Sequence, residues 1–347
     1  MDSPIKVLLT GASGTVGSEV LKLLSQTKEF ELTVFDRYNA KSKKTFSPYS
    51  KHVHIVYGDI SNKKDIEKLP VNLDIVIHLA AIIPPLAEEN PELTFKVNAQ
   101  GTKELIQFLE KTSPDVFVIY SSSVSVYGDR ISNPNIYTTD TLKPSEGDIY
   151  AQSKIEAEEI IKSSQLKWSI FRLAAIMKNH KISKLMFEMP LNTILEICTP
   201  EDTALAFVNA VYKETALTGK VFNLGGGANC CITYREFLQK SFLLFGLGKL
   251  DFPAYAFADK NFHCGIMADS QELNTILKFQ KHTLNDYFEQ TAKSIPLFKR
   301  MLGFIFQIPI KWYLLNQSEP YKAVRKNNKL MIRHFFNESN HALLTLK

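Results

Sequence analysis

The sequence predicts an α/β protein in which a doubly wound parallel sheet is followed by a smaller C-terminal lobe. Short runs rich in Val, Ile, Leu and Phe alternate with longer segments of helical periodicity. These runs are almost continuously apolar, which is typical of parallel strands that crossover helices bury on both faces. After about Met177 such runs become sparse, and helical, loop and aromatic segments follow.

The expected strands are residues 6–10, 31–35, 54–57, 74–78, 116–120, 168–172 and 221–224. Between the first two strands, residues 18–25 place Val20, Leu23 and Leu24 on one face of a helix. Residues 41–52 are polar and basic, and we expect them to form a loop.

The first strand ends in a glycine-rich turn, TGASGTVG at residues 10–17, which leads directly into the first helix. Gly11 would make the tight turn, Gly14 would let backbone approach a pyrophosphate, and Gly17 would let the helix pack on the sheet. The free amides of the helix N-terminus would face the phosphate charge. A strand before and a helix after the glycines indicate a dinucleotide site rather than a flexible loop. The predicted cofactor-binding residues of this turn are Gly11, Ser13, Gly14, Thr15, Val16 and Gly17.

Acidic residues follow the second and third strands. Asp36 ends the second strand, where a carboxylate can hydrogen-bond the adenosine ribose and repel a 2′-phosphate, which favours NAD. Arg37 follows at once, and its guanidinium could instead accommodate the 2′-phosphate of NADP. Asp59 and Ile60, after the third strand, could bound the adenine and pack on it.

With such a turn, residues 1–175 are predicted to form a Rossmann domain to which a later strand, at about 220–225, returns. Residues 176–290 are expected to form a small lobe on the substrate side, and residues 291–347 a basic, aromatic extension. A second part is expected because single cores stop growing at roughly 250–300 residues.

A serine-rich strand end and a Tyr-Lys pair indicate acid/base chemistry. The fifth strand opens into three serines that end at Ser123, and Tyr150 and Lys154 follow four residues apart in a helical segment. That spacing places both side chains on one helix face, where an ammonium favours the ionised form of the phenol. Without such help a tyrosine, with a pKa of about 10, is a poor acid or base at neutral pH.

Taken together, these motifs resemble the extended short-chain dehydrogenase/reductase family of the NAD-dependent epimerase/dehydratase type. The matching pieces span most of residues 5–175, and later landmarks extend the likeness to about residue 240. They are TGASGTVG at 10–17, Asp36, GDI at 58–60, HLAA at 78–81, Asn98 with Gly101 and Thr102, SSSVSVYG at 121–128, YAQSK at 150–154, Arg172, Asp202 and NLGGG at 223–227.

The resemblance implies a role for each matching residue. It implies that Tyr150 is the catalytic acid/base, that Lys154 is its partner and a ligand of the cofactor ribose, and that Ser123 polarises the substrate oxygen. No metal site is predicted. Beyond the glycine turn, the predicted cofactor-binding residues are Asp36, Arg37, Asp59, Ile60, Leu79, Ala80, Ala81, Asn98, Ser121, Tyr150 and Lys154.

The substrate class is left open between two alternatives. Sugar-nucleotide epimerases of the family carry a long insertion after the sixth strand, whereas here only residues 173–201 separate Arg172 from Asp202. The sequence therefore predicts an NAD(P)-dependent oxidoreductase or epimerase that acts on a hydroxyl or carbonyl, either in a nucleotide sugar or in a smaller compound that is not epimerised. A non-catalytic NAD(P)-binding redox sensor is a further alternative, against which the complete Ser-Tyr-Lys set argues.

Positive charge is concentrated at the C-terminus. Residues 296–347 hold nine Lys/Arg and two Asp/Glu, whereas the rest of the chain has a net charge of −2, so no nucleic-acid partner is expected. Residues 296–315 form an aromatic, apolar run that Lys299, Arg300, Pro309 and Lys311 make unsuitable for spanning a bilayer. We favour a helix packed on the enzyme or in a homodimer, and an interfacial segment whose cations meet anionic lipid is the alternative.

Composition and cysteine usage predict the setting. The chain has 45% hydrophobic and 22% charged residues, as globular proteins do, and its four cysteines lack disulfide or metal spacing, which indicates a reducing compartment. The N-terminus has no signal-peptide pattern. We therefore expect a cytoplasmic enzyme with a small-molecule substrate, and peripheral contact with the inner membrane surface as the alternative.

Overall fold

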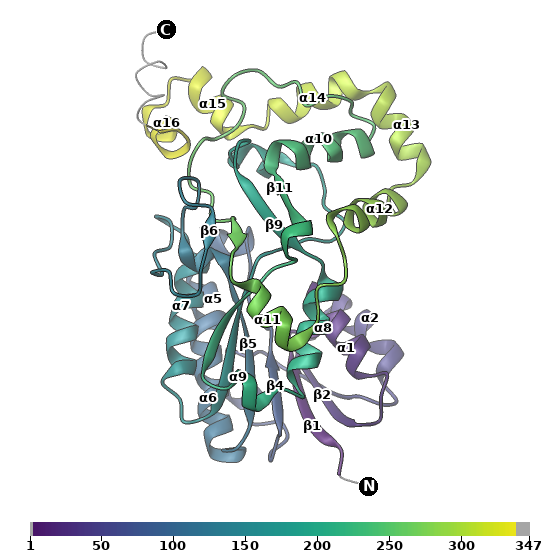
Figure 1. The fold of residues 1–347 in the computed structure, drawn as a ribbon, viewed down its shortest axis with the longest axis vertical. Coiled ribbons are helices and arrows are strands. Elements are labelled where there is room, and N and C mark those ends of the chain that lie inside the picture. Colours follow the sequence, from purple (N-terminus) through teal and green to yellow (C-terminus); the bar gives the residue numbers. More distant parts are fainter. Residues whose placement is uncertain (1–2, 338–347) are drawn as a thin grey trace.

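A parallel seven-stranded sheet is the central element of the computed structural model, which describes residues 3–337 (Figure 1). The sheet order is β10-β7-β5-β4-β1-β2-β3, and every neighbouring pair is parallel. The chain reverses its direction across the sheet between β1 and β4, where ligands of open α/β sheets bind. The strands are β1 (Ile5–Thr10), β2 (Phe30–Asp36), β3 (His54–Tyr57), β4 (Ile75–His78), β5 (Phe117–Ser123), β7 (Lys167–Leu173) and β10 (Lys220–Leu224). The predicted fold class is confirmed.

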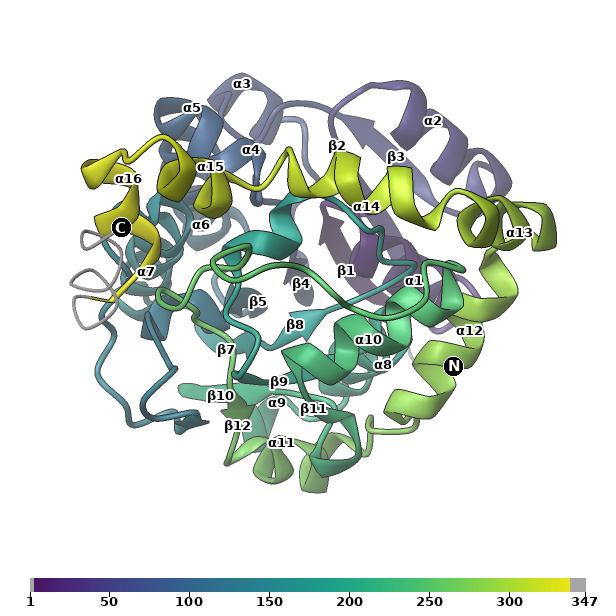
Figure 2. The ribbon, with the colours of Figure 1, turned by 90° about the horizontal axis from the view of Figure 1, so that it is seen from above.

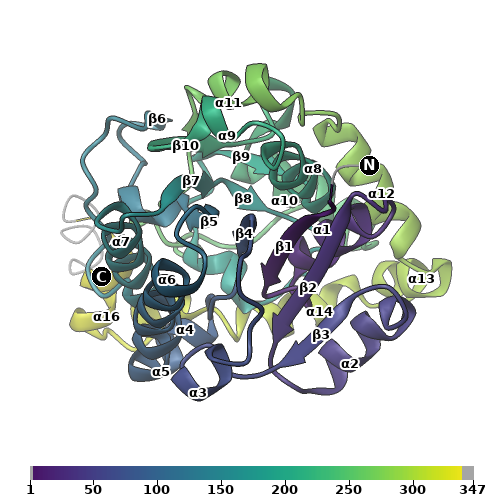
Figure 3. The ribbon, with the colours of Figure 1, turned by 90° about the horizontal axis from the view of Figure 1, so that it is seen from below.

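Helices cover both faces of this sheet (Figure 3). Side chains alternate along β1, so that Val7 and Leu9 pack toward α1 and α8 whereas Leu8 packs toward α6, and all three are fully buried. The helices on the first side are α1 (Thr15–Leu24), α8 (Pro200–Ala210) and α11 (Ser270–Leu277), and those on the other are α3 (Lys63–Ile66), α6 (Gly101–Thr112) and α7 (Ile149–Lys162).

The expectation of a loop at residues 41–52 is wrong. This segment contains α2 (Ala40–Phe46) and a 3₁₀ turn, Ser47–Tyr49. The helix begins with a reciprocal cap, in which Asn39 Oδ1 accepts from the Ser42 backbone and Ser42 Oγ accepts from the Asn39 backbone. Phe46 is buried and anchors the helix, so one apolar residue and a cap suffice where the sequence is otherwise polar.

Smaller sheets lie beyond the carboxyl ends of the central strands (Figure 1). Buried Glu196, on β9, joins them, because its two carboxylate oxygens accept from the backbone N–H groups of Gly227 and Met267. One sheet contains β8 (Ala175–Ile176), β9 (Ile194–Cys198) and β11 (Cys231–Thr233), and the other β6 (Asn135–Ile136) and β12 (Ile266–Met267). The helices among them and near the site are α4 (Leu86–Glu89), α5 (Pro91–Phe95), α10 (Tyr234–Leu244) and α12 (Leu284–Ser294). The short helix α9 (Glu214–Leu217) lies at the amino ends of β7 and β10, where Glu214 pairs with Lys167.

Four further helices form an arc at the end of the molecule opposite the described N-terminus (Figures 1 and 2). They are α13 (Leu297–Ile305), α14 (Gln307–Leu315), α15 (Glu319–Arg325) and α16 (Lys329–Phe335). Ser318 Oγ donates to the Ala256 carbonyl at 2.7 Å, and Ile332 and Phe335 pack on Ala258, which fixes the last two helices. Within residues 3–337 no helix combines the length and apolar character that crossing a membrane requires. The final residues of the predicted extension, 338–347, lie outside the described part.

Candidate active site

A cavity of about 460 Å³ lies at the carboxyl ends of β1, β2 and β4. Gly11 has φ +68°, and a Cβ added there would lie 2.7 Å from the Ala80 backbone nitrogen. A Cβ at Gly17 would collide with the Gly11 carbonyl, so the turn and the start of α1 both need glycine. The predicted residues that line the cavity are Gly11, Ser13, Gly14, Thr15, Asp36, Arg37, Asp59, Ile60, Leu79, Ala80 and Ala81.

Six predicted cofactor residues are not in that lining. Val16 packs partly buried against the core, and Gly17 acts through close approach to Gly11. Asn98 lies between α5 and α6, Ser121 lies on β5, and Tyr150 and Lys154 lie on α7.

The carboxylate of Asp36 is fixed at the edge of the cavity. Its Oδ2 accepts from the Ser13 backbone and its Oδ1 from the Arg37 backbone, both at 2.8 Å. Lys41 and Asn39 also line this end. Neither is among the predicted residues, because α2, which brings them here, has no clear signal in the polar sequence.

A buried histidine positions the backbone of the cavity wall. His78 Nδ1 is hydrogen-bonded to Thr10 Oγ1 at 2.7 Å, and its Nε2 to Thr102 Oγ1 at 2.9 Å. Thr10 Oγ1 in turn accepts from the backbone N–H groups of Leu79 and Ala80. Burial lowers the pKa of His78 to about 3, so the ring is a neutral link at physiological pH.

Asn98 joins the cavity wall to the helix that carries Tyr150. It lies in a π-helical turn, Lys96–Gln100, a feature often found at functional sites. Its Oδ1 accepts from the Ile82 backbone at 2.7 Å, and its Nδ2 donates to the Ile82 carbonyl and to Ser153 Oγ, both at 2.9 Å. The Asn98 side chain therefore positions residues around the cavity, although it is not part of the cavity lining.

Ser123, Tyr150 and Lys154 come together where β5 meets α7. Tyr150 lies in the first turn of α7, which Asp148 caps by accepting from the Ala151 backbone at 2.8 Å. The Ser123 hydroxyl lies close enough to the Tyr150 phenol to lower its pKa, and the Lys154 Nζ lies 5.8 Å from the centre of the Tyr150 ring. The helical spacing thus places both α7 side chains near the end of β5.

The charges in this group differ from the sequence-based expectation. Burial raises the pKa of Tyr150, and the hydrogen bond from Ser123 offsets only part of that effect. Lys154 donates instead to the Tyr120 hydroxyl at 3.2 Å and to the Ser121 carbonyl at 2.7 Å. Burial lowers the pKa of Lys154 to about 7. The described side chains therefore favour a neutral phenol.

A buried ion pair supports the strand ends beneath these residues. Arg172 on β7 binds both carboxylate oxygens of Glu158 on α7, with Nη2 to Oε2 at 2.7 Å and Nε to Oε1 at 2.9 Å. Ser122 Oγ donates to Glu158 at 2.6 Å, and Arg172 Nη1 donates to the Tyr127 hydroxyl at 2.8 Å. The Arg172 guanidinium and Ser122 lower the pKa of Glu158 against its burial. Glu158 was missed, because nothing in its local sequence distinguishes it from neighbouring surface glutamates.

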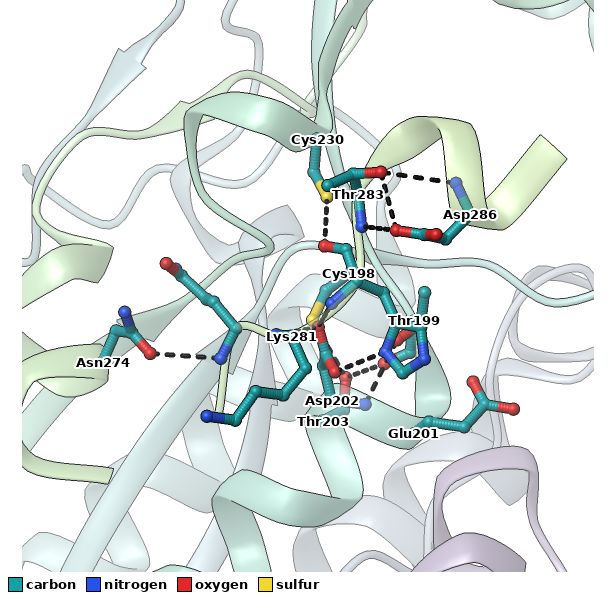
Figure 4. Close-up of polar contacts among 12 residues, drawn as sticks. Cys198, Thr199, Glu201, Asp202, Thr203, Cys230, Asn274, Lys281, Thr283 and Asp286 are labelled. Atoms are coloured by element: carbon teal, nitrogen blue, oxygen red, sulfur yellow. Dashed lines mark hydrogen bonds and ion pairs between the residues drawn. The ribbon is translucent and has the colours of Figure 1, made fainter. Parts of the chain in front are cut away.

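Asp202 holds a distant segment rather than the cavity (Figure 4). It follows Thr199, which caps α8 by accepting from the Asp202 backbone at 3.1 Å. Its Oδ2 accepts from the backbone N–H groups of Lys281 and His282, both at 2.9 Å, and its Oδ1 is 2.7 Å from His282 Nδ1. Buried Asp202 thereby fixes the segment that leads into α12.

A family model described as the NAD dependent epimerase/dehydratase family matches residues 7–185, more than half of the 347-residue chain. The chain belongs to this family. The matched range contains the glycine turn, Asp36, Asn98, Ser123, Tyr150 and Lys154.

Curated relatives match this family member over shorter stretches. A 3-beta-hydroxysteroid dehydrogenase of Mycolicibacterium neoaurum is 30% identical over 166 residues, which cover 45% of this chain and 42% of that protein. A CDP-paratose 2-epimerase of Salmonella typhi is 30% identical over 131 residues, which cover 36% of this chain and 38% of that protein. The chain thus spans less than half the length of these relatives.

Solved structures resemble this family member over most of its length. Pal from Bacillus thuringiensis has a TM-score of 0.65 at 22% identity, with 83% of this chain and 98% of that chain covered. UDP-glucuronic acid 4-epimerase from Bacillus cereus, in complex with UDP-glucuronic acid and NAD, has a TM-score of 0.67 at 19% identity, with 86% and 100% covered. At such identities the likeness establishes the fold.

Proposed function

We propose that this member of the NAD dependent epimerase/dehydratase family is an enzyme that transfers a hydride between NAD and a hydroxyl or carbonyl substrate. The observation that supports this proposal most directly is that Ser123, at the end of β5, lies beside Tyr150 on α7, with the Lys154 Nζ 5.8 Å from the centre of the Tyr150 ring. A serine hydroxyl, a phenol and an ammonium in that order can polarise a substrate oxygen and exchange its proton.

The residues of the cavity fit a dinucleotide. Gly11 and Gly17 leave the backbone of the turn without side chains, so that a pyrophosphate could approach it. Asp36 has a fixed carboxylate at the edge of the cavity where a ribose would be recognised. When bound, NAD supplies or accepts the hydride. NADP is the alternative cofactor, since Arg37 and Lys41 line the same end and could hold a 2′-phosphate.

The chain's own residues manage the proton. In a reduction, the Tyr150 hydroxyl donates its proton to the substrate oxygen as that oxygen gains charge, and in an oxidation it accepts the proton of the substrate hydroxyl. Ser123 donates a hydrogen bond to the same oxygen and keeps it beside Tyr150. Lys154, held by Tyr120 and the Ser121 carbonyl, supplies positive charge near the phenol and can contact the cofactor ribose.

The surroundings of Tyr150 favour a small, uncharged reacting group. Besides burial, the carboxylates of Asp148 and Glu88 raise the pKa of Tyr150, so negative charge lies near the phenol. An anionic group next to the reacting carbon would be repelled there. The compact segment 173–201, which forms β8, β9 and a 3₁₀ turn, also leaves out the long insertion of nucleotide-sugar epimerases. Net oxidation or reduction of a small substrate is therefore preferred over epimerisation of a nucleotide sugar.

Replacing Tyr150 tests the proposed role. Tyr150→Phe should lower kcat by about 10²–10⁴-fold, the usual contribution of a general acid or base, and leave cofactor affinity within about twofold. Tyr137→Phe, at an exposed tyrosine, is the matched control and should keep full activity. Full turnover by Tyr150→Phe with bound cofactor would exclude the assignment.

Mass spectrometry of nucleotide released from the freshly purified, denatured protein separates the reaction types. Retained NAD indicates a cofactor regenerated in each turnover, as in an epimerase. An empty protein that binds added NAD(H) or NADP(H) reversibly supports a dehydrogenase or reductase. Cofactor binding without turnover of any hydroxyl or carbonyl substrate would instead support a redox sensor.

A further inference from the structure

The helices α13 and α14 leave most of their large apolar side chains exposed. In α13 the buried residue is Gly303, where a Cβ would collide with the Phe245 carbonyl, and in α14 it is Leu314. The exposed fraction is 79% for Ile308 and 68% for both Phe304 and Trp312. We call these ten exposed residues the apolar arc: Leu297, Phe298, Met301, Leu302, Phe304, Ile305, Phe306, Ile308, Trp312 and Tyr313.

The segment that contains the apolar arc also carries positive charge and contains no acidic residue. Residues 290–318 contain four Lys/Arg and no Asp or Glu. Lys299 and Arg300 are exposed on α13, and within the described residues no ion pair is found for either. The exposed cations of the neighbouring α15 and α16 segment extend this charge: Arg325, Lys326, Lys329 and Arg333.

We propose that the apolar arc docks on the surface of an anionic lipid bilayer, with α13 and α14 lying in the interface. Each helix has nine residues, about 14 Å of helix, whereas the hydrocarbon core is about 30 Å thick, so these helices lie on a bilayer and do not cross it. Large apolar and aromatic side chains interleaved with Lys and Arg are the composition of interfacial helices. Trp312 and Tyr313 supply rings that favour the headgroup region.

The positive charge beside the apolar arc favours an anionic bilayer over a second copy of the chain as its partner. A two-fold symmetric dimer places the same patch on both partners, so Lys299 and Arg300 would meet the same two cations, whereas the nearby carboxylate of Asp251 is already paired with Lys311 on α14. No acidic residue within 290–318 could compensate them. Anionic headgroups compensate them directly, and each cation near such a surface contributes about 1 kcal/mol. This inference does not depend on the proposed catalytic function.

Sedimentation of the full chain with vesicles tests the proposal. The protein should sediment with vesicles that contain phosphatidylglycerol and remain soluble with pure phosphatidylcholine. Lys299→Gln/Arg300→Gln should weaken binding about tenfold or more. Lys103→Gln/Lys111→Gln, which removes two exposed lysines of α6, is the matched control and should bind as the parent does. Absence of binding, or equal binding to neutral vesicles, would overturn the proposal.

Fluorescence identifies the part of the surface that is buried. The chain has two tryptophans, Trp168 on β7 and exposed Trp312 on α14. Anionic vesicles should shift the emission to shorter wavelength, and Trp312→Phe should abolish the shift. Phe304→Ser/Ile308→Ser should weaken vesicle binding about tenfold or more, whereas Val71→Ser, at an exposed valine of the central domain, should not. If the protein instead formed a lipid-independent dimer that buries Trp312, the apolar arc would be a contact between two copies of the chain, and the proposal would be overturned.

Discussion

At the residue scale, the pKa of Tyr150 predicts the pH dependence of the two reaction directions. Burial raises this pKa, so the phenol is an acid over the neutral range and becomes a base only as the pH rises. We expect kcat/KM for oxidation to increase about tenfold per pH unit up to about pH 7 and to level off above it, where Lys154 no longer carries the charge that stabilises the phenolate. Reduction should be flat below about pH 7 and decrease above it, because Lys154, with a pKa of about 7, loses its charge there. An oxidation rate that keeps rising about tenfold per pH unit between about pH 7 and 9 would show that the charge of Lys154 is not needed.

Asp36 gives a second prediction at this scale, on cofactor choice. Its carboxylate is fixed by two backbone N–H groups at the cavity edge, beside Arg37 and Lys41. Asp36→Ala should raise the Kd for NAD about tenfold or more, as expected for the loss of hydrogen bonds to a charged group. It should weaken NADP binding less, since both cations remain. Titration calorimetry with each nucleotide gives the ratio, and an unchanged ratio would mean that Asp36 does not face the ribose.

At the element scale, the Glu158–Arg172 pair links α7 to β7 beneath the site, and its loss should destabilise the protein. Arg172→Met leaves the buried carboxylate with the partly exposed Lys162, 3.2 Å away, as its charged partner, which should cost up to about 3–5 kcal/mol in urea unfolding at pH 7. The double variant Glu158→Leu/Arg172→Met should recover much of this loss. Because the pKa of Glu158 is lowered on folding, the stabilisation is present above its unfolded pKa of about 4.5. It disappears as the pH falls through the folded value, so the cost of Arg172→Met should shrink in acid.

Some elements of the fold can be predicted from the sequence and others cannot. The central strands could be predicted because strands buried on both faces are continuous apolar runs, as Val7, Leu8 and Leu9 illustrate. The helix α2 could not be predicted, because it depends on the Asn39–Ser42 cap and on Phe46 in a polar stretch. Among site residues, glycines and the Tyr-Lys pair have local signatures. The partner of Arg172 has none, because only the packing of α7 against β7 selects Glu158 from several glutamates.

At the scale of the whole molecule, the chain after the central sheet is held to it by a few buried polar contacts. Asp202 on α8 accepts from two backbone N–H groups at Lys281 and His282, immediately before α12, and the arc of α13 to α16 follows. Glu196 ties β9 to β12 in the same way. Each carboxylate accepts from two backbone N–H groups, Asp202 through Oδ2 alone and Glu196 through both oxygens, so each fixes a segment that has little regular structure of its own.

Removing Asp202 should therefore loosen the C-terminal half without unfolding the central sheet. Asp202→Ala leaves two backbone donors without their partner and should cost about 1–3 kcal/mol locally. Hydrogen exchange followed by mass spectrometry should show faster exchange at 281–295, with the protection of β1, β4 and β5 unchanged. Glu201→Ala is the matched control, because Glu201 directly precedes Asp202 and pairs with Lys178 at the surface. This variant should change the exchange of neither region. If Asp202→Ala exposes the central strands equally, the two halves unfold as one unit, and Asp202 is part of a single cooperative core.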